Sequence, residues 1–266
     1  MIRRIAPLVL AVGLAIASAP ARATPLALPS LPLLPGANDF TCRPPATHPR
    51  PVVLVHGTGV NSLITWSLVA PALHARGYCV FALDHGNLGT GRIEDSARAL
   101  RTFVDRVLAA TGAATVDIIG HSSGGMMPRY YTRFLGGAAK VAQLIGVAPA
   151  NHGSTNPLFP VFGLLGCAAC AQMVAGSPFL VKLNAGGDPL PGVAYTVIST
   201  RYDYVVTPYT SQALTGLGVT NVVLQDRCPL NLADHFFITY NPVTLQWIQN
   251  ALARGGPANP SFRPAC

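Results

Sequence analysis

A pentapeptide of the pattern G-x-S-x-G, Gly-His-Ser-Ser-Gly at residues 120–124, offers the clearest chemistry in the chain. It follows the apolar run Val-Asp-Ile-Ile at 116–119, which is typical of a sharp turn between a buried strand and a helix. Such a turn strains the backbone of its central serine, and the flanking glycines leave room for it. The pattern predicts that Ser122 is a nucleophile whose hydroxyl stands above the edge of a sheet.

A serine hydroxyl is a weak nucleophile, so a base must remove its proton and a carboxylate must orient that base. Sites built on this turn carry first the acid and then the base after the serine. Asp203 follows the expected strand 194–200 and should reach the same sheet edge as Ser122. Asp226, at the end of the last expected strand, is the main rival. Asp188 precedes strand 194–200, which predicts a turn residue at the opposite edge.

His235 is the candidate for the base because, of the seven histidines, it alone follows both Ser122 and Asp203. It lies after the last expected strand and before the final expected helix, where it can reach the same edge of the sheet. The other histidines are expected to pack, to orient loops or to face solvent. His152, at the start of a long insertion, could line a pocket.

Attack of a serine on a carbonyl carbon creates an oxyanion, and preorganised amides usually stabilise it. Ser123, the residue after the nucleophile, supplies one such amide. The first expected strand ends in Val-His-Gly-Thr-Gly at 55–59, a turn whose amides can point to the same place. Thr58 offers both its amide and its hydroxyl there. The sequence therefore predicts an oxyanion hole formed by Thr58 and Ser123.

The elements that must hold these residues alternate along the chain between apolar strands and helices. Each expected strand is almost continuously apolar, which is typical of a strand buried on both faces of a parallel sheet. The alternation predicts an α/β fold with a mostly parallel, doubly wound sheet flanked by helices. The expected strands are 52–56, 79–84, 116–120, 141–148, 194–200 and 221–225, and the expected helices are 64–76, 93–110, 124–135 and 243–254.

One segment, 151–193, separates two expected strands by more residues than a simple connection needs. It begins at the carboxyl end of strand 141–148, the edge where open sheets bind ligands, and long insertions are usually functional. It is rich in large apolar side chains, some of which must complete the core. We therefore expect residues 151–193 to form the wall or lid of a substrate pocket.

The first 23 residues resemble a secretory signal, because Arg3 and Arg4 precede an apolar stretch at 5–17 and Ala-Arg-Ala at 21–23 fits a cleavage site. The apolar stretch is too short to span a membrane. We expect an exported protein, extracellular or periplasmic, with no transmembrane segment. A proline-rich arm at 24–45 should precede one catalytic domain at 46–266, which is long enough for a single core.

The distribution of charge argues against a nucleic-acid partner. The chain has 18 basic and 10 acidic residues, and three of the basic ones lie in the first 23 residues, which leaves a net charge of +5. The remaining basic residues are spread out, whereas a nucleic-acid groove needs clustered basic residues with interleaved aromatic ones.

Six cysteines in an exported chain predict up to three disulfides, with 15 possible connectivities. Their places along the chain favour Cys42–Cys79, Cys167–Cys170 and Cys228–Cys266. No metal site is expected at Cys167–Cys170, because no second cysteine pair or histidine cluster completes one.

Four tracts together resemble the lipase class 2 family of secreted bacterial α/β-hydrolase lipases and, more distantly, fungal lipase B. The resemblance implies an α/β-hydrolase fold, hydrolysis of carboxylic esters with lipid-like acyl chains, no cofactor, and a triad on Ser122, Asp203 and His235. Fungal lipase B also supports the Cys42–Cys79 pairing. Similar lipases often have glutamine where this chain has Ser123, a change that keeps the backbone donor. The tracts are Val-Val-Leu-Val-His-Gly-Thr-Gly at 52–59, 116–130, Tyr-Thr-Val-Ile-Ser-Thr-Arg-Tyr-Asp at 195–203, and the residues around His235.

The sequence thus predicts a secreted serine carboxylic-ester hydrolase that works through an acyl-serine intermediate, first of all a triacylglycerol lipase. A short-chain esterase and a polyester or cutin hydrolase share this chemistry, and acyl transfer shares the acyl-enzyme. An inactive hydrolase fold used for binding is the alternative from another class. The expected partner is a lipid or ester substrate at a lipid–water interface, and we expect a monomer with no nucleic acid, no cofactor and no metal ion.

Overall fold

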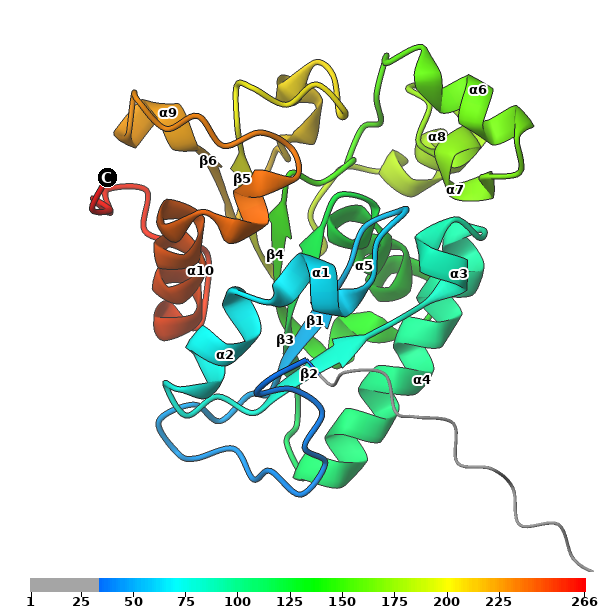
Figure 1. The fold of residues 1–266 in the computed structure, drawn as a ribbon. Coiled ribbons are helices and arrows are strands. Elements are labelled where there is room, and N and C mark those ends of the chain that lie inside the picture. Colours follow the sequence, from blue (N-terminus) through cyan, green and yellow to red (C-terminus); the bar gives the residue numbers. More distant parts are fainter. Residues whose placement is uncertain (1–33) are drawn as a thin grey trace, which may run out of the picture. The chain divides into compact units, whose positions relative to one another are not determined.

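The computed structural model describes residues 34–266, so the expected signal at 1–23 and the first part of the arm at 24–45 lie outside the described residues. Six parallel strands form one sheet in the order β2-β1-β3-β4-β5-β6 (Figure 1). The predicted parallel, doubly wound sheet is confirmed. The strands are β1 (Val52–Val55), β2 (Val80–Leu83), β3 (Val116–His121), β4 (Val141–Val147), β5 (Ala194–Ser199) and β6 (Val219–Val223).

Helices cover both faces of this sheet, with α4 and α5 on one side and α2 and α10 on the other (Figure 1). The side chains of β1 show why the strand sequence is continuously apolar. Val53 and Val55 belong to the core on one face, whereas Val52 and Leu54 belong to the core on the other. The helices are α1 (Ser62–Trp66), α2 (Val69–His74), α3 (Gly86–Gly89), α4 (Ile93–Thr111), α5 (Ser123–Phe134), α6 (Leu158–Leu164), α7 (Ala168–Gln172), α8 (Pro178–Asn184), α9 (Leu224–Arg227) and α10 (Pro242–Arg254).

Two expected elements differ from the structure. The helix expected at 64–76 is divided into α1 and α2, because Pro71 has no N–H to continue the helical hydrogen bonds and is tolerated only in the first turn of α2. The strand expected at 221–225 is β6, which ends at Val223. Gln225 has left the ladder, and its side chain instead accepts the N–H of Arg201 at 3.0 Å.

The described part of the arm lies along the free edge of the sheet. Asn38 donates its N–H to the Val80 carbonyl at 2.9 Å, and its side chain pairs with both backbone groups of Ala82 at 2.8 and 3.0 Å. These bonds occupy backbone groups that an edge strand would otherwise expose.

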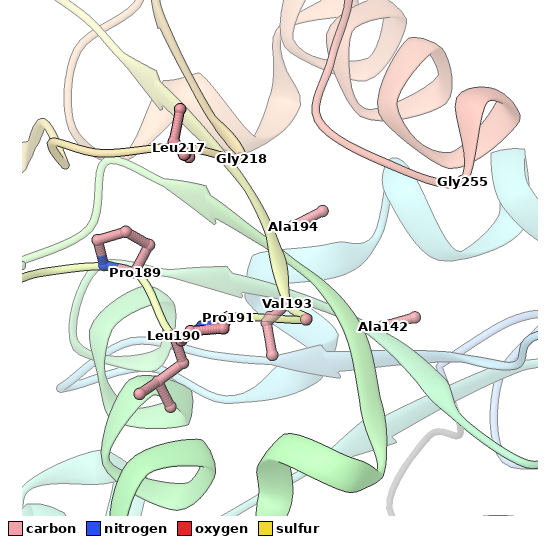
Figure 2. A pocket seen from close by; sticks show the side chains of 10 residues that line it. Ala142, Pro189, Leu190, Pro191, Val193, Ala194, Leu217, Gly218 and Gly255 are labelled. Atoms are coloured by element: carbon pink, nitrogen blue, oxygen red, sulfur yellow. The ribbon is translucent and has the colours of Figure 1, made fainter.

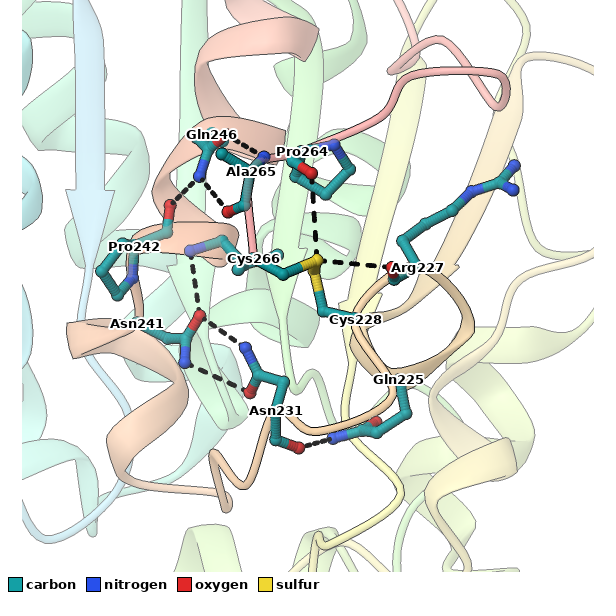
Figure 3. The surroundings of a disulfide bond; sticks show 11 residues. Gln225, Arg227, Cys228, Asn231, Asn241, Pro242, Gln246, Pro264, Ala265 and Cys266 are labelled. Atoms are coloured by element: carbon teal, nitrogen blue, oxygen red, sulfur yellow. Dashed lines mark hydrogen bonds between the residues drawn. A yellow bond between two sulfur atoms is a disulfide. The ribbon is translucent and has the colours of Figure 1, made fainter.

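The three expected disulfide pairings are confirmed. Cys42–Cys79 ties the arm to the start of β2, and Cys167–Cys170 links the end of the α6–α7 connection to α7. Cys228–Cys266 holds the carboxyl-terminal residue against the loop after α9 (Figure 3). Beside that bridge, the side-chain amide of Gln246 pairs with both backbone groups of Ala265 at 2.8 and 3.0 Å. The tail is therefore pinned to α10 as well.

Candidate active site

Ser122 lies between β3 and α5 with φ 55° and ψ −125°, a conformation that a residue with a side chain rarely adopts. Two glycines make this turn possible. A methyl group on Gly120 would overlap the Gly124 carbonyl, and a methyl group on Gly124 would overlap the His56 carbonyl. The ends of β1 and β3 therefore meet the start of α5 at backbone contact distance, as the G-x-S-x-G pattern requires.

The structure brings Asp203 and His235 to Ser122. His235 Nε2 lies 3.1 Å from Ser122 Oγ, and His235 Nδ1 lies 2.7 Å from Asp203 Oδ2. Asp203 follows β5, His235 follows α9, and a parallel bridge between Tyr202 and Asp234 holds the two loops side by side. The side chains of His235 and Asp203 are 2% and 0% exposed. Their interaction is therefore largely shielded from water, which strengthens it.

The Asp203 carboxylate is held in one orientation by four donors. Oδ1 accepts the N–H groups of Val205 and Val206 at 2.9 and 2.8 Å. Oδ2 accepts Gln212 Nε2 at 2.8 Å in addition to His235. Because an ionised carboxylate only accepts, His235 carries its proton on Nδ1, and its Nε2 is left to accept from a hydroxyl.

The other aspartates considered above lie elsewhere. Asp226 pairs with Arg201 at the surface. Asp188 lies in a bend before β5, as expected, and its carboxylate is in addition buried 3.2 Å from Arg129 Nη2. His152 Nε2 lies 2.9 Å from the same carboxylate. His152 therefore belongs to an ion cluster beside α5 and does not line the cavity at Ser122. The carboxylate of this cluster pairs with the guanidinium of Arg129, which could not be buried without such a partner.

Thr58 and Ser123, the residues expected to bind an oxyanion, contact each other next to Ser122. Their hydroxyl oxygens lie 2.9 Å apart, and the Thr58 hydroxyl also donates to the Gly89 carbonyl at 3.1 Å. Ser123 is the first residue of α5, so its N–H has no acceptor within the helix and lies at the positive end of the helix dipole. Thr58 occupies the turn after β1 and lines the same cavity as Ser122.

Three further histidines, His56, His85 and His121, are buried around the site and orient its loops. His121 Nε2 donates to the His235 carbonyl at 2.8 Å, and His56 Nδ1 donates to the Gly57 carbonyl at 2.7 Å. Burial lowers the pKa of His85 to about 4 and the pKa of His121 to about 3. These rings are therefore neutral near pH 7, and each acts as a fixed hydrogen-bonding group.

Ser122 and His235 open into a cavity of about 460 Å³. Eight of its lining residues come from the insertion 151–193, which folds into α6, α7 and α8. No charged side chain lines the cavity, and the bridged pair Cys167 and Cys170 forms part of its wall. Several apolar side chains at its mouth face solvent, among them Leu158, Phe162 and Leu165 on α6 and its end, and Tyr204 and Phe236 opposite.

A second cavity of about 680 Å³ lies at the opposite edge of the sheet, where Ala142, Ala194 and Gly218 mark the amino ends of β4, β5 and β6 (Figure 2). No titratable side chain lines it, so it offers no acid, base or nucleophile. Over residues 34–266 we find no cluster of three or more histidine, cysteine or acidic side chains suited to a metal ion. In the same part of the chain, no helix is both long and apolar enough to cross a membrane.

The parallel sheet and the strained serine turn at its carboxyl edge define an α/β-hydrolase. The chain belongs to the lipase (class 2) family, whose model matches residues 49–247. The crystal structure of Aspergillus fumigatus lipase B superimposes with a TM-score of 0.74 at 21% identity, over 86% of this chain and 57% of that one. The mature lipase BlEst2 of Bacillus licheniformis gives 0.63 at 15% identity, over 79% of this chain and 94% of that one.

Two curated relatives are described as triacylglycerol lipases. Those of Pseudarthrobacter phenanthrenivorans and Burkholderia plantarii are each 36% identical over 89 residues, which is 30% of this chain. The match covers 27% of the first relative and 24% of the second. The chain therefore aligns with only about a quarter of the length of these lipases.

Sequence reasoning missed two contributors to the site, Gln212 and the turn α3. Gln212 is a single glutamine outside any motif, and its bond to Asp203 depends on how the loop after β5 folds. For α3 a signal existed, since His-Gly-Asn-Leu-Gly at 85–89 follows an apolar strand and carries two glycines. Nothing in that pattern indicates that its carbonyls bond the loop that carries Thr58.

Proposed function

We propose that the protein is a secreted serine carboxylic-ester hydrolase, specifically a triacylglycerol lipase, with Ser122, Asp203 and His235 as its catalytic residues. The observation that carries this proposal is the continuous line of hydrogen bonds from Asp203 through His235 to Ser122, at the floor of an apolar cavity. Three disulfides fit an extracellular enzyme.

In this proposal His235 Nε2 takes the Ser122 proton as Oγ attacks the ester carbonyl carbon. The oxyanion forms beside the amides of Thr58 and Ser123, which stabilise its charge. The bond to the alcohol then breaks, and the imidazolium returns its proton to the departing alkoxide, which leaves an acyl ester on Ser122. Water, deprotonated by His235, attacks that ester; the bond to Ser122 Oγ breaks, the imidazolium returns the proton to Oγ, and the carboxylic acid is released. Asp203 holds the imidazole tautomer and stabilises the imidazolium in both steps.

The cavity wall supports an apolar, uncharged acyl group. A carboxylate or ammonium group of a substrate would be buried there without a partner of opposite charge, because no charged side chain lines the cavity. Leu158, Phe162 and Leu165 are 54%, 47% and 77% exposed at its mouth. Such exposed apolar side chains beside a pocket favour a substrate presented by an apolar surface.

The test is hydrolysis of p-nitrophenyl butyrate by Ser122→Ala. We expect kcat to fall by at least about 10⁴-fold, because loss of the nucleophile leaves only binding and oxyanion stabilisation. Ser199→Ala is the matched control, since Ser199 is also buried but donates to the Val222 carbonyl in the sheet. A Ser122→Ala variant that hydrolyses the ester at the wild-type rate would refute the proposal.

A substrate panel separates the lipase from its alternatives. We expect wild type to release fatty acid from emulsified triacylglycerol at a rate that Ser122→Ala abolishes. Activity confined to soluble short-chain esters would assign an esterase instead. Release of soluble products from a polyester film, without activity on triacylglycerol, would assign a polyester hydrolase. A folded wild type inactive on every ester would leave the binding protein as the remaining function.

A further inference from the structure

A turn with left-handed backbone lies against the loop that carries Thr58. All four residues of α3, Gly86–Gly89, have positive φ, with values of 52°, 51°, 57° and 71°. Two of them, Asn87 and Leu88, carry side chains, and consecutive residues of that kind resist this conformation. Strain of this kind persists only where the surroundings hold it, and it clusters at functional sites.

Three contacts join this turn to the loop after β1. The Leu88 carbonyl accepts the N–H of Gly59 at 2.7 Å, and the Gly89 carbonyl accepts the Thr58 hydroxyl at 3.1 Å. The α-carbon of Gly89 lies directly on the loop, since a Cβ there would stand 2.9 Å from the Gly57 carbonyl oxygen. Because a right-handed turn is the mirror image of a left-handed one, it would direct both carbonyls elsewhere.

The turn is clamped at both ends. Before it, His85 and His56 exchange two hydrogen bonds of 3.2 Å, and their rings stack with centroids 4.2 Å apart. After it, the Thr90 carbonyl accepts the N–H of Ala169 on α7 at 3.1 Å. The strained backbone is therefore held between the end of β1 and the wall of the cavity.

The Gly57–Thr58 peptide connects this packing to the chemistry. That peptide carries the Gly57 carbonyl on one side and the Thr58 N–H on the other, and it is rigid and planar. A group that displaces the Gly57 carbonyl therefore rotates the whole peptide plane and changes the direction of the Thr58 N–H. Gly89 contacts the carbonyl side of this plane, and the proposed function assigns the opposite, N–H side to the oxyanion.

We propose that the turn Gly86–Gly89 is a positioning element for the oxyanion hole, which acts through Gly89 on the Gly57–Thr58 peptide and through the two carbonyls on Thr58 and Gly59. The inference rests on the proposed function, because it assigns Thr58 to the oxyanion. The left-handed backbone is thereby explained, since it is the conformation that aims both carbonyls at the loop.

The test compares Gly89→Ala with Gly112→Ala. Both glycines have φ 71°, but a Cβ on Gly112 meets nothing within 4 Å, whereas one on Gly89 meets the Gly57 carbonyl. Both variants carry the backbone cost of a left-handed alanine, and only Gly89→Ala disturbs the loop. We expect Gly89→Ala to lower kcat by about 10²-fold with little change in KM, and Gly112→Ala to leave kcat within about twofold. Equal kcat in the two variants would overturn the proposal.

A second pair of variants covers the case in which Gly89→Ala does not fold. Leu88 is 51% exposed, so its replacement removes little packing. Leu88→Val raises the strain, because β-branched residues resist positive φ most, whereas Leu88→Gly relieves it. We expect kcat to fall in Leu88→Val and to be retained in Leu88→Gly. A Leu88→Val variant with the wild-type kcat would contradict the proposal.

Labelling with a fluorophosphonate distinguishes failure of this inference from failure of the proposed function. Wild type that neither reacts at Ser122 nor hydrolyses an ester would refute the function before any variant is compared. Wild type that does both, with Gly89→Ala equal to Gly112→Ala, would refute only the role of the turn. A boronic acid that mimics the tetrahedral intermediate should bind Gly89→Ala more weakly than Gly112→Ala, which a purely structural role would not produce.

Discussion

Replacement of Asp203 by asparagine should separate the catalytic role of the carboxylate from its structural role. In the wild type, Oδ1 accepts the two backbone amides of Val205 and Val206, and Oδ2 accepts Gln212 and His235. Asparagine can keep both amide bonds through its oxygen. Its NH₂ group then faces two former donors, Gln212 and His235, and both of them must become acceptors.

Gln212 can do so at little cost. Its Oε1 is buried without a hydrogen-bond partner among the described residues, so rotation of the amide presents an acceptor to the asparagine. The rotation exchanges one unpaired group for another, and we expect the free energy of unfolding to change by about 1 kcal/mol or less. The second N–H of the asparagine then points at His235 Nδ1, which must accept. The ring proton moves to Nε2, which can no longer take the Ser122 proton, and kcat should fall by about 10⁴-fold.

Asp203→Ala is the structural comparison, because it leaves the donors of Val205, Val206 and Gln212 without their acceptor. Each unpaired buried donor costs at least about 1 kcal/mol, the lower value applying when water enters the vacated space. The free energy of unfolding should therefore fall by about 3 kcal/mol. For a domain of this size that lowers Tm by about 6–12 °C. Thermal unfolding followed by circular dichroism and hydrolysis of p-nitrophenyl butyrate give the two readouts. A kcat of Asp203→Asn within about tenfold of wild type, or equal Tm in the two variants, would refute this reasoning.

The ion cluster beside α5 should make stability depend on pH. Burial opposes the charge of Asp188, but hydrogen bonds from His152 and Thr215 outweigh it and lower the pKa of Asp188 to about 2. The bond to Asp188 in turn raises the pKa of His152. Asp188 therefore stabilises the fold above about pH 3.8, and this effect is lost as the pH falls toward 2. Protonated His152 stabilises the fold below about pH 6.5, and this effect is lost as the pH rises through its raised pKa. In urea unfolding, the free energy of unfolding of His152→Gln should lie furthest below that of wild type near about pH 5 and closer to it near about pH 9. An equal difference in free energy at both pH values would contradict this. Serine at both Cys167 and Cys170 should raise KM several-fold for long acyl esters and little for short ones, because the bridge is part of the cavity wall. A uniform change across a series of p-nitrophenyl esters would count against that role.

The sheet and the grouping of Ser122, Asp203 and His235 could be predicted because both follow from patterns that are visible in the sequence itself. Continuous apolar runs mark strands buried on two faces, and residues just beyond the carboxyl ends of parallel strands must gather at one edge. Asp203 and His235 are separated by 32 residues, yet strand order alone brought their loops together. The short helices α6 and α7 were not predicted, because 7 and 5 residues are too few for a helical period to show.

The partners of buried polar groups were not predictable in the same way. Arg129 and Asp188 are 59 residues apart, and neither lies in a motif that distinguishes a buried ion from a surface residue. Their pairing depends on the course of the chain between α8 and β5, which leaves no periodic trace. The same holds for Gln212, whose neighbours offer no local reason for a bond to Asp203. Sequence patterns of this kind specify elements and edges, whereas hydrogen-bond partners depend on loops.

The strained backbone of this protein is concentrated where the proposed chemistry lies. Of the five non-glycine residues with positive φ in the described chain, four follow the carboxyl ends of strands of the sheet: Asn87 and Leu88 after β2, Ser122 after β3 and Ala148 after β4. Hydrogen bonds from this edge also cross between strands, since the Ser122 N–H donates to the Val147 carbonyl at 3.0 Å. A sheet buried on both faces stabilises the fold enough to offset such strain, and residues with poor local propensity can then be held where a reaction needs them. Local rules should therefore fail at this edge more often than elsewhere, and the turn at Gly86–Gly89 is the place where that failure points to a function.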